Sequence, residues 1–124
     1  RPLIIRTAFE LEDIMQRLNT ALLSDFLSEP GVSAIMFGAP HGEATMDQSV
    51  QFAEAWRECH DEANFGYIDA FENVAAARSY SVRVLPTTMI TRDGEIVAWI
   101  EGRHSSIRIA QAIRSAQRVY AEAA

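Results

Sequence analysis

Apolar positions along the chain fall into short runs and into stripes with helical spacing, and each pattern predicts a different element. Residues 32–37 (VSAIMF) form a near-continuous apolar run, typical of a central strand buried on both faces. Residues 65–70 (FGYIDA) predict a second strand. Two β-rich runs, 87–92 (TTMITR) and 95–102 (EIVAWIEG), flank an Asp-Gly pair, and this arrangement predicts a β-hairpin.

Two helices are expected around the first strand. Asn19 and Thr20 offer N-cap side chains to a helix over residues 21–29 (ALLSDFLSE), which Pro-Gly ends. Thr45 and Gln48 match a capping box, so a second helix is predicted over residues 46–61. Three apolar residues share one face of this second helix: Phe52, Trp56 and Cys59.

Two further helices are expected around the hairpin. Residues 73–80 (NVAAARSY) predict a short alanine-rich helix, and an extended segment over residues 81–86 leads from it into the hairpin. Ser105 or Ser106 can cap a long final helix. Its shared apolar face would consist of Ile109, Ile113, Ala116 and Tyr120.

The first 18 residues leave two assignments open. Residues 2–9 fit either a short helix or a strand. Residues 11–18 have apolar residues at helical spacing, but the stretch also fits a short edge strand at its end.

The order of elements is therefore α, β, α, β, α, β, β, α. This order predicts a three-layer α/β/α sandwich with a central mixed sheet, a C-terminal antiparallel hairpin and a final helix. A chain of 124 residues fits one domain, residues 1–124. Within it, residues 1–31 would form an N-terminal extension and the first helix, and residues 32–120 the core.

Composition excludes several function classes. The net charge is −6, from 11 basic residues, all arginine, and 17 acidic ones, which argues against nucleic acid and suits a basic or amphipathic partner. No apolar run approaches the roughly 20 residues needed to span a bilayer, and no signal-peptide pattern opens the chain, so we expect a cytoplasmic protein. Cys59 is the one cysteine, which excludes an internal disulfide or a cysteine zinc cluster. We expect no cofactor.

From about residue 32 to residue 116, the arrangement resembles the thioredoxin fold. The most specific features are residues 84–88 (VLPTT), the Asp-Gly hairpin and Gly102. In that family the proline before the hairpin strand is cis and faces the active-site loop. Pro86 stands at the matching position, so the resemblance implies a cis peptide bond before it.

The loop after the first buried strand departs from redox-active thioredoxins. Gly42 stands at the place of the attacking cysteine, Thr45 at that of the resolving cysteine, and Met36 at that of the family's buried acid. Dithiol exchange needs a thiolate of lowered pKa and a second thiol that resolves the mixed disulfide. We therefore expect no dithiol oxidoreductase activity and no catalytic residue.

Within the superfamily, the chain is similar to the nickel–iron hydrogenase expression and formation accessory proteins (the HupG/HyaE/HoxO group). The shared features are residues 22–27 (LLSDFL), an apolar strand before a proline-containing loop without CxxC, and a Val-x-x-x-Pro approach to the hairpin. Residues 41–47 (HGEATMD) lack the basic residue and second proline of that group. The resemblance implies a chaperone that binds the twin-arginine signal peptide of the hydrogenase small-subunit precursor and delays its export until the metal clusters and partner subunit are in place.

In thioredoxin-like proteins, the backbone before the cis-proline pairs with an extended peptide, and this groove does not need the cysteines. The candidate peptide-binding residues are His41, Glu43, Asp47, Val84, Leu85, Pro86, Glu101 and Arg103. Three of them, Glu43, Asp47 and Glu101, would supply negative charge for an arginine pair. A solvated acidic face without a role is the alternative.

Five residues have competing interpretations. Cys59 fits a small apolar core residue, with its acidic neighbours Glu58, Asp61 and Glu62 raising its pKa; the alternative is a single-thiol redox protein. His41 and His104 could approach each other and, with Glu43, bind a metal, but two exposed loop histidines are favoured. His60 is expected to interact favourably with the negative C-terminal end of its helix dipole. Trp99 is expected to pack in the core rather than contact a peptide. A purely structural or oligomerising module is a further possibility.

Overall fold

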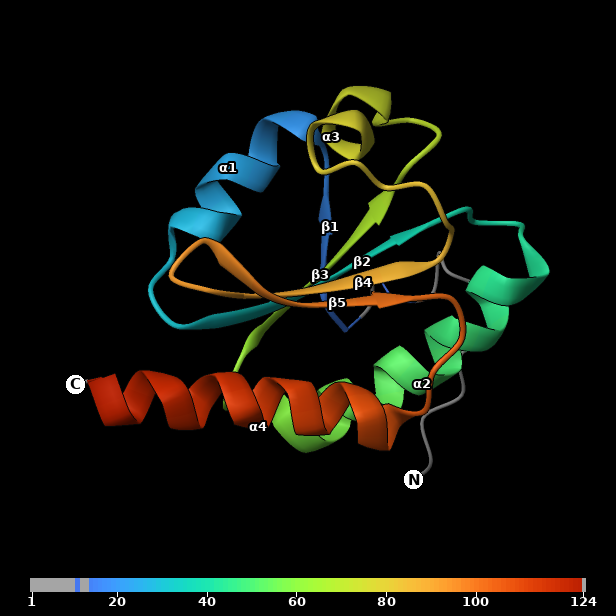
Figure 1. Cartoon of the computed structure of the whole chain (residues 1–124). Coiled ribbons are helices and arrows are strands. Elements are labelled where there is room, and N and C mark those ends of the chain that lie inside the picture. The colour runs from blue at the N-terminus through green and yellow to red at the C-terminus, as the bar shows by residue number, and fades with distance from the viewer. Residues whose placement is uncertain (1–10, 12–13, 124) are drawn as a thin grey trace.

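The computed structural model describes residue 11 and residues 14–123, with side chains as far as residue 118. Five strands form one mixed sheet in the order β1-β3-β2-β4-β5 (Figure 1). Their bounds are Gln16–Leu18 (β1), Val32–Gly38 (β2), Asn64–Asp69 (β3), Thr87–Arg92 (β4) and Glu95–Glu101 (β5). The strands β1, β3 and β2 run parallel, β4 runs antiparallel to β2, and β5 antiparallel to β4.

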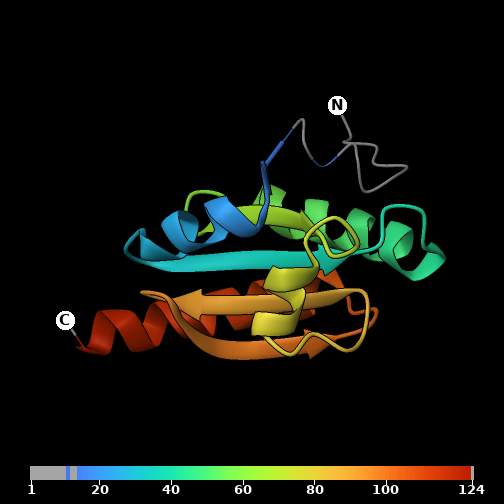
Figure 2. The same ribbon diagram turned by 90° about the horizontal axis from the view of Figure 1, so that it is seen from above.

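In the described part of the chain, four helices cover the two faces of the sheet. They span Thr20–Ser28 (α1), Glu43–Cys59 (α2), Val74–Ser79 (α3) and Ser106–Ala123 (α4). Helices α1 and α3 lie on one face, and α2 and α4 on the other (Figures 1 and 2). The predicted three-layer sandwich with its C-terminal hairpin and final helix is confirmed.

Each face of the sheet has its own apolar core, because successive side chains of a strand point to opposite faces. Every residue of β2 is buried, as its apolar sequence predicts. Ile35 and Phe37 join the cluster beneath α1 and α3. Met36 joins the cluster beneath α2 and α4, with Phe52 and Ile113 among its members.

The ambiguous N-terminal stretch ends as an edge strand, one of the two assignments left open. Leu18 of β1 pairs with Ile68 of β3 and is buried in the α1/α3 cluster. Gly66 makes this approach possible, because a Cβ there would lie 2.7 Å from Leu18 Cδ1. Thus β1 and α1 pack on the same sheet as the rest of the core. The prediction for residues 2–9 falls outside the described residues.

The first and last helices begin as the sequence predicts. Asn19 Oδ1 accepts a hydrogen bond from the Leu22 N–H (2.8 Å), so Asn19 is the N-cap of α1. Ser105 Oγ accepts one from the Arg108 N–H (3.2 Å) at the start of α4. The expected apolar face of α4 is buried at Ile109, Ile113 and Ala116. The side chain of Tyr120 lies outside the described part. Among the described residues, no helix has both the length and the hydrophobicity to cross a membrane.

The start of α2 corrects a prediction. The helix begins at Glu43 rather than at residue 46, its N-cap is Gly42, and no side chain caps it. The predicted capping box is wrong because Thr45 and Gln48 are buried within the helix and bond to neighbouring loops. Thr45 Oγ1 accepts from the Ala39 N–H (3.0 Å), and Gln48 Oε1 from the His104 N–H (2.7 Å).

Candidate peptide-binding groove

Three loops meet at one edge of the sheet, called here the loop edge: residues 39–42, 80–86 and 102–105 (Figure 1). They follow β2, precede β4 and follow β5, so the register of the sheet places their ends side by side. Thr87 pairs with Phe37 and with Glu101. The Gly102 N–H donates to the Pro86 carbonyl (2.8 Å), which extends the β4–β5 ladder to the loop edge. Sequence positions more than 60 residues apart thus form one surface.

The segment before β4 presents an open stretch of backbone. The Leu85–Pro86 peptide bond is cis, as the resemblance implied. The Val84 carbonyl accepts a hydrogen bond from Thr87 Oγ1 (2.6 Å), and Pro86 is buried. The N–H and C=O of Leu85 make no hydrogen bond to any described residue. The Val84 side chain is 40% exposed beside them. Backbone groups in this state can pair with an added extended segment.

The loop over residues 39–42 is held by hydrogen bonds at the position where a redox pair would stand. The Gly42 N–H donates to the Ala39 carbonyl (2.9 Å), and the Ala39 N–H donates to Thr45 Oγ1 (3.0 Å). Met36, at the place of the family's buried acid, is fully buried among apolar side chains. Two hydrogen bonds thus hold this loop, and its described atoms include no thiol.

Helix α2 holds the third loop through three side chains. Asp47 forms an ion pair with Arg103 (2.7 Å from Oδ2 to Nη1). Gln48 accepts from the His104 N–H, and Gln51 Oε1 accepts from the Ser106 N–H (2.8 Å). The wall of the groove that follows β5 is therefore fixed to α2.

These contacts change the expected charge of the groove. The Asp47 carboxylate is occupied by Arg103, so its charge is already balanced within the chain. Glu101 Oε2 accepts a hydrogen bond from Trp99 Nε1 (3.3 Å), and the Trp99 ring is half-buried against the α1/α3 cluster. Glu43 is exposed in the first turn of α2. The loop edge is thus less acidic than its composition suggests.

The histidines His41 and His104 have different surroundings. The His104 ring contacts the Glu101 carbonyl through Nε2 (2.9 Å), and His41 is exposed. No cluster of three potential ligands among His, Cys, Asp and Glu occurs in the part of the chain that the structure describes. The sequence-based alternative of a site from His41, His104 and Glu43 finds no support. His60 caps the C-terminus of α2 and stacks on Trp56, with ring centroids 4.9 Å apart.

Cys59 is fully buried on the core side of α2, as the apolar interpretation predicts. Burial is the main cause that raises the pKa of its thiol; Arg114 lowers the pKa, and Glu62 and Glu58 raise it. The expected contribution of Asp61 is absent from these causes, and Asp61 instead contacts His60 (3.3 Å).

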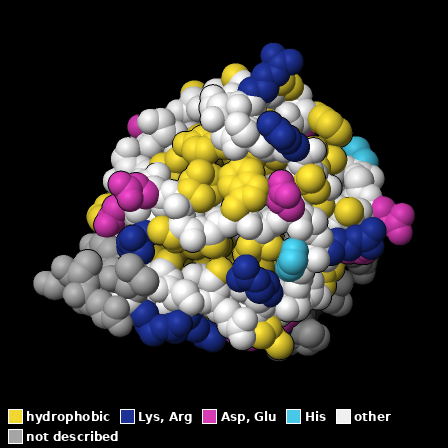
Figure 3. Space-filling view, in the orientation of Figure 1, with side chains coloured by type: hydrophobic (Ala, Val, Ile, Leu, Met, Phe, Trp, Pro, Cys, Tyr) yellow, Lys and Arg dark blue, Asp and Glu magenta, His cyan; other side chains and the backbone are white. Residues whose placement is uncertain are grey.

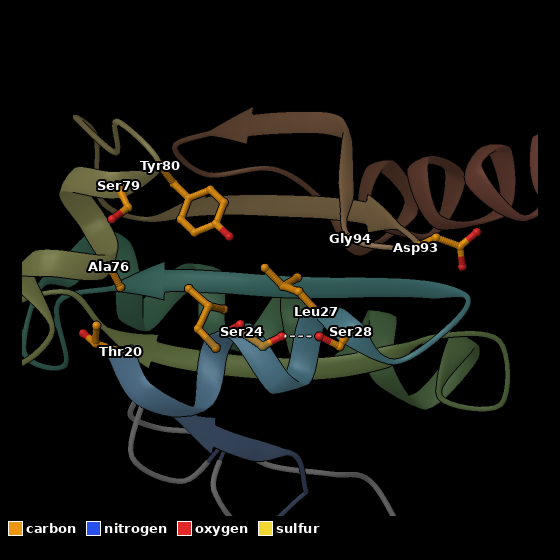
Figure 4. Close-up of a pocket in the computed structure, with 10 residues that line it drawn as sticks. Thr20, Ser24, Leu27, Ser28, Ala76, Ser79, Tyr80, Asp93 and Gly94 are labelled. Carbon is orange, nitrogen blue, oxygen red and sulfur yellow. Dashed lines mark hydrogen bonds between the residues drawn. The ribbon is translucent and has the colours of Figure 1, made fainter.

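Between α1 and α3 the structure has a hollow of about 620 Å³, which shares Tyr80 with the loop edge and which the sequence did not predict (Figure 4). It reaches the hairpin turn at Asp93 and Gly94, and Leu27 and Tyr80 point toward its centre. Apolar side chains gather over this region on the surface (Figure 3). The hydroxyls of Ser28 and Ser79 donate to carbonyls of their own helices, so these hydroxyl groups are satisfied internally.

The family follows from the match of the sequence to a thioredoxin family model over residues 37–115. The chain belongs to the thioredoxin family. Its matched region contains α2, the cis-proline segment, the hairpin and the first half of α4, and thus the whole loop edge. No curated protein matches the sequence.

Solved thioredoxin structures have the same fold at low sequence identity. A chloroplastic thioredoxin z is 15% identical with a TM-score of 0.75, covering 84% of this chain and 95% of that one. Fasciola hepatica thioredoxin is 22% identical with a TM-score of 0.74, covering 82% and 99%. Malassezia sympodialis thioredoxin is 17% identical with a TM-score of 0.72, covering 94% and 97%. At these identities the likeness shows the fold.

Proposed function

We propose that this thioredoxin-family chain holds an extended polypeptide at the loop edge beside Pro86. The observation that carries the proposal is the unpaired backbone of Leu85: its N–H and its C=O form no hydrogen bond with any described residue. An added segment would pair with these groups by β-augmentation and pack on the exposed Val84 side chain. The hydrogen bonds that fix the two flanking loops support a preformed groove, which lowers the entropic cost of binding.

The same proposal assigns the chain no dithiol chemistry. Gly42 and Thr45 occupy the positions of the cysteine pair, and Thr45 uses its hydroxyl to hold Ala39. Cys59 is buried in the core beneath α2, and burial raises the pKa of its thiol, which disfavours the reactive thiolate. These features support a binding protein rather than an oxidoreductase.

In its finer form, the proposal makes the ligand the twin-arginine signal peptide of a hydrogenase small-subunit precursor, bound in the cytoplasm. Its support is the resemblance of residues 22–27 and of the approach to Pro86 to the hydrogenase accessory proteins. Glu43 and Glu101 are the acidic side chains near the groove that would face the two arginines, since Asp47 is paired with Arg103.

Isothermal calorimetry with a synthetic twin-arginine signal peptide tests both levels of the proposal. We expect binding by the native chain, weaker binding of a twin-glutamine version, and loss of binding in Val84→Arg, which places a bulky cation in the groove. Ile96→Arg is the matched control, because Ile96 is another exposed apolar residue (45%) in β5 near the hairpin turn. Equal binding by both variants would disprove the groove. Equal binding of both peptides, with the groove variant still defective, would disprove only the arginine-specific ligand.

A further inference from the structure

A second hollow, of about 600 Å³, lies between the first half of α2 and the loop after β5. Val50 forms an apolar edge that is 41% exposed. The polar lining consists of Asp47, Gln48, Gln51, Arg103, His104 and Ser105. The hollow is separate from the open backbone at Leu85, because no residue of the segment 80–86 lines it.

In Gln48 and Gln51 the carboxamide oxygen is already hydrogen-bonded, and the NH₂ group is left to bind a ligand. A backbone N–H can bond only to the oxygen of a carboxamide, which fixes how each amide is turned. Gln48 Oε1 is bound by the His104 N–H and Gln51 Oε1 by the Ser106 N–H. The NH₂ group of Gln51 bonds to no other described residue. Both side chains are therefore left as donors.

Gln48 has a buried donor that lacks an acceptor, and this is independent evidence for the site. It is fully buried, it lines the hollow, and its Nε2 has no hydrogen-bond partner among the described residues. A buried donor without a partner costs free energy that an incoming oxygen can recover. At this position the hollow lacks an acceptor.

The remaining polar groups also favour an acceptor. Ser105 Oγ already accepts from the Arg108 N–H, so its own proton is available to donate. Arg103 donates to Asp47 through Nη1, and a guanidinium has five N–H donors in all. Asp47 also lines the hollow, and its Oδ2 accepts the hydrogen bond from Arg103.

Charge decides which acceptor fits. Asp47 and Arg103 cancel, so the lining has no net positive charge, and a dianion such as phosphate is disfavoured more strongly than an anion of single charge. A planar carboxylate has one charge and two oxygens that accept parallel N–H bonds, and Val50 offers contact to an apolar group next to it. We propose that this hollow binds a carboxylate attached to a short apolar body, with Gln48, Gln51 and Arg103 as its donors.

Titration of ¹⁵N-labelled protein with N-acetyl-leucine, followed by NMR, tests the proposal. We expect saturable shifts of the Gln51 side-chain amide and of the His104 and Ser106 backbone amides. N-acetyl-leucinamide, the neutral isostere, should bind at least fivefold more weakly. Larger shifts with inorganic phosphate than with N-acetyl-leucine, or equal shifts with acid and amide, would overturn the proposal.

Gln51→Glu keeps the oxygen that accepts from the Ser106 N–H and replaces the donor by a negative charge. We expect it to weaken N-acetyl-leucine binding at least fivefold, whereas Gln111→Glu, the same change at an exposed position of α4 outside the hollow, should leave binding unchanged. Unchanged binding in Gln51→Glu would also overturn the proposal. Val84→Arg should not affect the probe, so this result and the test of the peptide groove are separable.

Discussion

At the scale of single residues, Thr45 has a structural role at the position where the resemblance to thioredoxins places the resolving cysteine. Its hydroxyl accepts the Ala39 N–H, and its side chain is almost fully buried. Thr45→Val keeps the shape and removes this acceptor, so we expect a loss of about 1–2 kcal/mol in the free energy of unfolding, measured by urea denaturation.

Thr91→Val is the matched control. Thr91 is equally buried in β4, but its hydroxyl has no hydrogen-bond partner among the described residues. Removing it should leave stability unchanged or raise it by up to about 1 kcal/mol. Equal effects of the two substitutions would contradict the role given to Thr45.

Cys59 gives a prediction on pH. Because burial raises its pKa in the folded chain, the unfolded thiol ionises first, around its ordinary value of 9.0, and the unfolded state then binds fewer protons. Stability should therefore fall as pH rises above that value. The difference in unfolding free energy between the native chain and Cys59→Ala should shrink between about pH 8 and pH 10. A constant difference over that range would show that the thiol is not desolvated.

Residue roles were only partly predictable from the sequence. The spacing of Thr45 and Gln48 fits a capping box, yet the hydroxyl and carboxamide bond to Ala39 and His104. His104 lies 56 residues away from Gln48, and no local pattern encodes that contact. The same holds for the Asp47–Arg103 pair, which removes one of three predicted acidic groups.

At the scale of elements, the approach of β1 and α1 to β3 depends on Gly66. A Cβ there would meet Leu18 Cδ1 at 2.7 Å and Phe26 Cζ at 3.2 Å. We expect Gly66→Ala to destabilise the chain by roughly 1–3 kcal/mol through this overlap.

A double-mutant cycle with Leu18→Ala tests that cause, because shortening Leu18 removes its Cδ1 and Cγ atoms. In the Leu18→Ala background, Gly66→Ala should cost less than half as much. Costs that add to within about 0.5 kcal/mol would show that the clash with Leu18 is not responsible.

Elements with strong local signals could be predicted, and short ones could not. The Asp-Gly hairpin and the apolar run of β2 are both found where the sequence places them. The strand β1 has three residues, too few for periodicity to separate strand from helix, and its pairing with β3 is a tertiary contact. The start of α2 was misplaced because its N-cap is a glycine without a capping side chain.

At the scale of the whole molecule, the fold brings three distant loops to one edge, and the groove was predictable only through the family resemblance. Pro86 and the positions of Gly42 and Thr45 indicated where it would lie. The bonding state of Leu85 and the balance of charges required the assembled sheet.

Amide hydrogen exchange at Leu85 tests the central claim most directly. In the free chain, the Leu85 N–H bonds to no described residue and should exchange rapidly. If a polypeptide pairs with this backbone, saturating twin-arginine signal peptide should slow its exchange at least tenfold. Binding of the peptide with unchanged exchange at Leu85, and protection confined to other parts of the chain, would contradict the account.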